Sequence, residues 1–325
     1  MSSEKNIVFR LDANPSVGFG HAARCTKIAK RLVQAGFRCI FSGDFSEGAK
    51  EAIFNDNKDI KFVTGSQQVD CAVCLMDLMV DSEDPEVIDP QEIVNWTSCS
   101  GQLIFIHSGL WVPAVPRNVV VIGYQPRFHD FPQSDVYWGP DFAPIDRSEI
   151  RSNLPKSERV DALVALGGAP DWSVHERVVN LLKRLNPDAK INVLGSPVIP
   201  GKPNFVHSGG DIKFHIGVPS VYPLLSQAEV VIASFGNLCY EALHLGAKLI
   251  VLGQKKFQID CGNLLAEKGY CLSAGGLNDG FDQRISDCLR ILAGNGDQFS
   301  TAGKKAFDGC GIERIASLVA ERAIA

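Results

Sequence analysis

Several features that mark whole classes of protein are missing from this sequence. It contains no apolar run near the roughly 18 residues that a membrane-spanning helix needs. Its first residues, Met1–Asn6, are polar and do not form a secretory signal. There is no basic tract, and the formal net charge is −5, which argues against a nucleic-acid partner. We therefore expect a cytoplasmic protein without a transmembrane segment.

Patterns that bind metals are also scarce. The chain has 10 cysteines, but most of them lie within apolar runs, as small buried side chains with free thiols do. Cys71 and Cys74 form the only pair with zinc-like spacing, and no second pair follows at the distance that a zinc site needs. This pair also falls in a predicted strand, where residues three apart point to opposite faces. The sequence therefore predicts no metal site, and it indicates no other cofactor.

The 325 residues suffice for two domains of about 150 residues each. Short apolar runs alternate with helical patterns in each half, which is typical of parallel α/β sheets. The proline- and aromatic-rich segment 125–144 interrupts the pattern, and together with Ile145–Leu154 we interpret it as a connection between domains. We predict an N-terminal domain at 1–140, a second domain at 155–310 and a final helix at 311–325. The predicted strands are Lys5–Leu11, Phe37–Ser42, Ile60–Val63, Val69–Met76, Leu103–Ile106, Val119–Ile122, Val160–Leu166, Ile191–Leu194, Phe214–Ile216, Glu229–Ala233 and Lys248–Leu252.

The segment from Phe9 to Cys25 carries the most information. It reads as the end of a strand, a turn with Gly18 and Gly20, and the start of a helix, which is where α/β proteins bind ligands. The glycines allow backbone N–H groups to approach a ligand closely. His21 falls in the first helical turn, where the helix dipole disfavours imidazolium and leaves a neutral ring suited to general-base catalysis. The alternative for His21 is a capping or core histidine.

Three charged residues accompany His21. Asp12 follows the first strand and is predicted to orient His21 or to bind a sugar hydroxyl, with a turn cap as the alternative. Arg24 lies one turn after His21 and is predicted to face a phosphate or a carboxylate, unless it is a surface residue or pairs with Asp12. We therefore predict His21 and Asp12 as catalytic residues. Arg10, Gly18, Gly20 and Arg24 are predicted to bind substrate.

A second strand–turn–helix segment begins at Ala233. Ser234, Gly236 and Asn237 form a polar turn at a helix start, where backbone N–H groups favour a diphosphate. Glu241 follows one turn later and is placed to accept hydrogen bonds from ribose hydroxyls. The alternative is a helix cap followed by a solvated glutamate. Gly168, after the strand at 160–166, is a weaker candidate for close approach of a ligand.

The pattern Arg-x-Asp-x5-Gly-x-Gly-His-x2-Arg-Cys, from Arg10 to Cys25, resembles the N-terminal motif of the UDP-sugar hydrolases of pseudaminic acid biosynthesis and of related spore-coat polysaccharide proteins. The resemblance implies a GT-B-like fold, with two Rossmann-type halves facing a central cleft and the last helix packing back on the first half. It also implies that His21 activates water at the anomeric carbon. In GT-B enzymes that use UDP-sugars, the residues matching Ser234–Asn237 hold phosphates and the one matching Glu241 binds ribose.

The match is incomplete outside these two motifs. The loop at 253–269 resembles the family loop that contacts the sugar, which implies substrate contacts for Phe257 and Gln258. Phe257 stands where the hydrolase has asparagine, and an aromatic ring cannot make the hydrogen bonds of an amide. The sequence Ile106-His107-Ser108-Gly109 replaces the family's Ile-Asp-Asp-Leu. These two departures leave open whether the substrate and the reaction are those of the hydrolase.

We predict an enzyme that hydrolyses a UDP-sugar carrying deoxy or acetamido groups, in nonulosonic acid or surface polysaccharide biosynthesis. His21 would activate water for attack on the anomeric carbon, with release of UDP. The alternative is a GT-B glycosyltransferase in which an acceptor hydroxyl replaces water, and CMP-sugars are the alternative substrate. A nucleotide-sugar sensor without catalysis is a third class, but it would not need the base of an intact motif.

Overall fold

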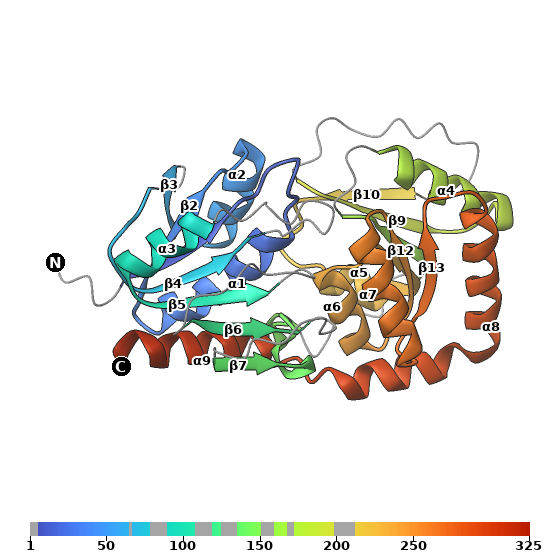
Figure 1. Ribbon diagram of the computed structural model, residues 1–325. Helices are drawn as coiled ribbons and strands as arrows, with labels where there is room; N and C mark the ends of the chain where they lie inside the picture. The colour runs from blue at the N-terminus through green and yellow to red at the C-terminus, as the bar shows by residue number, and fades with distance from the viewer. Residues whose placement is uncertain are drawn as a thin grey trace. The chain divides into compact units, whose positions relative to one another are not determined.

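The computed structural model divides into two compact units (Figure 1). Unit 1 comprises Met1–Asp146 and Gly309–Ala325, and unit 2 comprises Arg147–Asp308. Within the part of the chain that the structure describes, no helix is long and apolar enough to cross a membrane. The described residues are 6–64, 67–78, 90–107, 119–124, 135–150, 159–167, 172–197 and 212–325.

Unit 1 is built on a parallel sheet whose strands lie in the order β3-β2-β1-β4-β5-β6-β7. The order reverses between β1 and β4, which is the topological switch point of a doubly wound sheet. The strands are β1 (Asn6–Leu11), β2 (Arg38–Gly43), β3 (Lys61–Thr64), β4 (Cys71–Asp77), β5 (Ser100–His107), β6 (Val120–Gly123) and β7 (Asp135–Trp138).

The helices described in unit 1 are α1 (Gly20–Gln34), α2 (Glu47–Asp56), α3 (Pro90–Cys99) and α9 (Gly311–Ile324). Helix α1 carries an apolar stripe that includes Cys25, Ile28 and Leu32, and these three residues are buried. Helix α9 packs against α1, β4 and β5, so the last residues of the chain complete the core of the unit that contains the first. Two short 3-10 helices, η2 (Pro140–Phe142) and η3 (Arg147–Glu149), follow β7.

Unit 2 contains a six-stranded parallel sheet with the order β10-β9-β8-β11-β12-β13, and its order reverses between β8 and β11. The strands are β8 (Val160–Ala165), β9 (Ile191–Gly195), β10 (Ile212–Ile216), β11 (Ala228–Ala233), β12 (Lys248–Gly253) and β13 (Leu272–Gly276). The helices are α4 (Ser173–Leu185), α5 (Tyr222–Gln227), α6 (Asn237–Leu245), α7 (Lys256–Glu267) and α8 (Phe281–Ala306).

Every strand predicted from the sequence is present, and within the described part of the chain β7 and β13 also extend the sheets. The interpretation of 125–144 as a connection was wrong for Asp135–Trp138, which forms β7 and pairs with β6. The ring of Trp138 lies where a side chain on Gly123 would be, at 2.2 Å from that Cβ position, so glycine on β6 allows the edge strand to pack. Residues 125–134 lie outside the described residues. Strand β13 was not predicted because its sequence, with two glycines and a serine, has little β-propensity.

Candidate functional site

Both sequence motifs lie at strand ends beside a reversal of strand order. The first motif connects β1 to α1, and β4 is the strand next to β1. The second connects β11 to α6, and β8 is the strand next to β11. In open α/β sheets, ligands bind outside the carboxyl ends of the strands at such points. Each unit therefore has one candidate site, and we describe each by itself.

His21 is positioned by the turn between β1 and α1. Gly18 has a φ of +90°, which favours glycine, and its N–H donates to the Asn14 carbonyl at 2.8 Å. The Asn14 side chain accepts from the N–H of Ser16 at 3.1 Å and so closes the turn. Phe19 caps α1, and His21 becomes the second helical residue. A side chain at Gly20 would meet no atom within 4 Å, so packing alone does not require glycine there.

The partner of His21 is Asp77, the last residue of β4. His21 Nδ1 lies 2.7 Å from Asp77 Oδ1, and the carboxylate is fully buried. Because an ionised carboxylate only accepts hydrogen bonds, Nδ1 donates, and a neutral His21 ring then carries its lone pair on Nε2. Among the described residues, every polar contact of His21 is made through Nδ1. This arrangement is that of a general base with its orienting carboxylate.

Asp77 is also held by Arg24 and Cys25 from α1. Arg24 Nε and Nη2 donate to the two carboxylate oxygens, and Cys25 Sγ lies 3.3 Å from Oδ2. Arg24 Nη1 donates to the Tyr124 hydroxyl at 2.5 Å. Burial alone would raise the pKa of Asp77, but the charge of Arg24 and the contact with His21 outweigh it and hold that pKa well below its usual range. Asp77 is therefore a buried anion.

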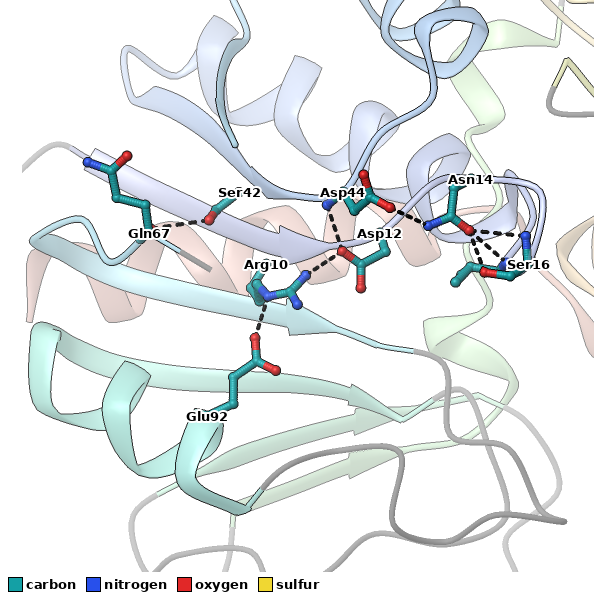
Figure 2. A network of polar contacts seen from close by, with 9 residues as sticks. Arg10, Asp12, Asn14, Ser16, Ser42, Asp44, Gln67 and Glu92 are labelled. Carbon is teal, nitrogen blue, oxygen red and sulfur yellow. Dashed lines mark hydrogen bonds and ion pairs between the residues drawn. The ribbon is translucent and has the colours of Figure 1, made fainter. Parts of the chain in front are cut away.

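Asp12 does not orient His21, because Asp77 takes that position. Asp12 Oδ1 accepts instead from Arg10 Nη1 at 2.7 Å and from the Asp44 N–H at 2.8 Å (Figure 2). Arg24 pairs with Asp77 and not with Asp12, so the alternative of a pair with Asp12 is wrong, and a contact of Arg24 with a substrate stays a prediction. A substrate contact by Asp12 stays a prediction.

Arg10 is the centre of a second polar network at the same end of the sheet. Its Nε donates to Glu92 of α3, and Asn14 Nδ2 donates to Asp44 at 2.9 Å (Figure 2). Arg10 precedes Leu11, and Leu11 is the register partner of Asp77, so Arg10 and Asp77 point to opposite faces of the sheet. The network therefore fixes the ends of β1 and β2 against α3, separately from His21.

In unit 2, neutral polar groups connect the ends of three strands. The Ser234 N–H donates to Ala165 at 3.2 Å, and Gln254 Nε2 donates to Ser234 Oγ at 2.7 Å and to the Gly167 carbonyl at 3.2 Å. Gly236, the N-cap of α6, has extended backbone, and a side chain there would meet nothing within 4 Å. The start of α6 is thus open on the side of Gly236. Gly168 lies outside the described residues.

Gln258 belongs to this scaffold. Its Oε1 accepts from the N–H groups of Gln254 at 2.9 Å and Lys255 at 3.2 Å, which is half of a capping box at the start of α7. Its Nε2 donates to the Phe235 carbonyl at 3.3 Å. The buried amide therefore holds two loops together, and the sugar contact that the resemblance implied stays a prediction. Phe257, beside it, is half-buried.

Glu241 lies on α6, one turn after Asn237, and is only 5% exposed. The alternative of a solvated surface glutamate is therefore wrong. Its ribose role stays a prediction, as does the phosphate role of Ser234, Gly236 and Asn237.

Three residues of these sites were missed in the sequence: Asp77, Tyr124 and Gln254. Asp77 could have been recognised from the sequence, because it is a single carboxylate at the end of an otherwise apolar strand. Tyr124 directly follows a buried strand, and nothing nearby distinguishes it from a core residue. Gln254 directly follows β12 and precedes α7, a position that parallels the other two motifs.

Groups that would hold a metal ion are not found among the residues that the structure describes. All 10 cysteines are free thiols. Burial raises the pKa of most of them, for example that of Cys39 to about 12, so they remain protonated at neutral pH.

The whole chain is similar to several solved structures at low sequence identity. The calicheamicin glycosyltransferase CalG4 matches with a TM-score of 0.66 and 11% identity over 98% of both chains. The S. aureus MnaA co-structure with UDP matches with a TM-score of 0.62 and 11% identity, over 99% of this chain and 98% of that one. The spinosyn rhamnosyltransferase SpnG in complex with thymidine diphosphate matches with a TM-score of 0.62 and 14% identity, over 97% and 99%.

At these identities the similarity establishes the fold and nothing further. No protein-family model matches the sequence, and no curated protein matches it. With two parallel α/β sheets and similarity over nearly the full length of these structures, the chain has the GT-B fold, built from two Rossmann-type units.

Proposed function

We propose that the protein is a nucleotide-sugar-dependent glycosyltransferase in which His21 is the catalytic base. The observation that carries the proposal is the His21–Asp77 pair at the switch point of unit 1, with Nε2 without a polar contact among the described residues. Similarity to two glycosyltransferases over the full chain supports transfer ahead of the hydrolysis expected from the sequence.

The chemistry follows from the His21 tautomer. Nε2 takes the proton of an acceptor hydroxyl while its oxygen forms a bond to the anomeric carbon of the donor sugar. The bond from that carbon to the diphosphate breaks, and the nucleoside diphosphate leaves with the electron pair. Attack opposite the leaving group inverts the anomeric centre. A positioned base of this kind contributes about 10²–10⁴-fold to the rate.

The nucleoside diphosphate is assigned to unit 2. The N-terminus of α6 and the open side of Gly236 suit a diphosphate, since the helix dipole favours an anion at this end. Glu241 is the candidate ribose ligand. Complexes of similar structures with UDP and with thymidine diphosphate support a pyrimidine nucleotide of one of these two kinds.

Hydrolysis is the second candidate, and one observation favours it. The spacing from Arg10 to Cys25 resembles that of UDP-sugar hydrolases, in which water takes the place of the acceptor. The same base and leaving group serve both reactions, so only the nucleophile differs.

One experiment separates the two reactions. The protein is incubated with UDP-, TDP-, CMP- and GDP-sugars in ¹⁸O-labelled water, first without acceptor and then with a library of glycosides, lipids and polyols. Mass spectrometry follows the free nucleotide and the sugar. Nucleotide release that requires an acceptor and yields a glycoside supports transfer. Labelled free sugar without acceptor supports hydrolysis, and tight binding without any turnover contradicts both.

A further inference from the structure

The carboxylate next to His21 is shared with a permanent cation. In a simple histidine–carboxylate pair, the negative charge compensates the imidazolium that forms when the base takes a proton. Here the Arg24 guanidinium already contacts both Asp77 oxygens, and its Nη2 lies only 3.1 Å from His21 Nδ1. A proton on Nε2 would therefore place a second positive charge directly beside the first.

The Arg24 side chain is fixed in this position from two sides. It is 4% exposed, with Asp77 on one edge of the guanidinium and the Tyr124 hydroxyl on the other. Its carbon Cζ also lies 5.8 Å from the centre of the Tyr124 ring. The planar guanidinium group of arginine binds a carboxylate through two parallel hydrogen bonds, and the ammonium group of lysine cannot reproduce this geometry. Burial works against the charge, but Asp77 outweighs burial and raises the pKa of Arg24, so the cation persists at all working pH values.

We propose that Arg24 is a positioning residue for the base. It holds the Asp77 carboxylate against Nδ1, and its charge cancels that carboxylate at His21, so that the ring stays neutral and able to accept a proton. This rests on the proposed function, because it assigns Arg24 to the reaction of His21. It replaces the expectation that Arg24 contacts a substrate phosphate.

The other described ionisable groups near His21 add no charge that would disturb the cancellation between Asp77 and Arg24. Among the described residues, the ionisable side chains in contact with the cluster include Asp77 from β4, Arg24 and Cys25 from α1, and Tyr124 after β6. Burial raises the pKa of the Cys25 thiol well above its usual value, so it adds no charge. Helices α2 and α9 also pack on α1, but neither brings a described charged side chain into contact with His21.

The test is a titration of the His21 ring by NMR, with ¹⁵N-labelled histidine and no substrate. His21→Gln assigns the signal. In the wild type we expect the proton on Nδ1 and a bare Nε2. In Arg24→Gln the carboxylate is left without its cation, and the midpoint of the His21 titration rises by about one pH unit, the size of effect expected for a charge this close. Cys25→Ala removes a neutral contact of the same carboxylate and leaves the midpoint in place.

A double variant keeps the test decisive if Arg24→Gln does not fold. Arg24→Gln with Asp77→Asn removes both charges and leaves no buried ion without a partner. If the two charges cancel at His21, the midpoint in the double variant equals that of the wild type. A midpoint that falls by about one unit in the double variant, or that does not move in Arg24→Gln, overturns the proposal. Because no turnover is measured, this result is independent of whether the protein proves to be a glycosyltransferase.

Discussion

The same strand-order reversal occurs in both units, and the side chains at the two reversals differ in kind. In unit 1 the strand ends bring together a buried histidine, an aspartate and an arginine. In unit 2 the strand ends are joined by a hydroxyl, two carboxamides and backbone groups. Topology thus determines where a ligand can bind, while the residues determine the chemistry: proton transfer suits the first end, and binding of an anion by backbone N–H groups suits the second.

The comparison also shows two ways of preorganising a site. Unit 1 relies on charge, and its key groups are held by forked hydrogen bonds in a buried environment where such bonds are strong. Unit 2 relies on neutral amides that fix loop backbones and leave the helix start open at Gly236. Substitutions in unit 1 should therefore change turnover, and substitutions in unit 2 should change nucleotide binding.

The largest effect is expected for His21→Asn. Without the base, kcat should fall by about 10²–10⁴-fold, whereas the affinity for the nucleoside diphosphate, measured by calorimetry, should not change. His215→Asn, on edge strand β10, is the matched control and should keep both values. If His21→Asn kept the wild-type kcat, the assignment of turnover to unit 1 and of nucleotide binding to unit 2 would be wrong.

Asp77→Asn should have the next largest effect, on stability. It leaves Arg24 buried without its anion, and breaking one side of a buried ion pair costs about 3–5 kcal/mol. Unfolding in urea, followed by circular dichroism, measures the loss. Adding Arg24→Gln to this variant should restore part of it. If Asp77→Asn unfolds at the urea concentration of the wild type, the cluster is not held by its charges.

Gln258→Ala tests the neutral scaffold of unit 2. It leaves the Gln254 and Lys255 N–H groups without their acceptor, at a cost of about 1–3 kcal/mol in unfolding free energy. Unfolding in urea measures this loss as well. Unchanged stability together with weaker sugar binding would instead favour the predicted contact between Gln258 and the sugar.

The smallest effect is expected for Gly236→Ala. The backbone there is extended and a Cβ meets nothing within 4 Å, so the melting temperature should not change. The methyl group would occupy the open side of the α6 N-terminus, and affinity for UDP or TDP should fall by about tenfold, or ~1.4 kcal/mol. Gly294→Ala, also in open space but on α8, is the control. Equal nucleotide affinity in both variants would argue against a diphosphate at Gly236.

Local patterns were sufficient to predict the elements and the position of His21. The apolar stripe of α1 and the glycines before it place that residue at a helix start whatever surrounds it. The failures share a physical cause. Asp135–Trp138 becomes a strand because β6 offers an unpaired edge, and Leu272–Gly276 becomes one because β12 does. Leu272–Gly276 has little β-propensity of its own, and Asp135–Trp138 is only 4 residues long, so tertiary pairing decides.

By itself, then, the sequence determined two parallel α/β units and one helix-start motif in each, because strand, turn and helix signals act over a few residues. Only the tertiary structure decided which carboxylate serves His21. Asp77 lies 56 residues away, and Tyr124 lies 100 residues from Arg24. The parallel register that sets β4 beside β1 brings Asp77 level with Leu11 on the α1 face and leaves Asp12 and Arg10 on the other. This pairing joins strands that are far apart in the sequence, so patterns that act over a few residues do not reveal it.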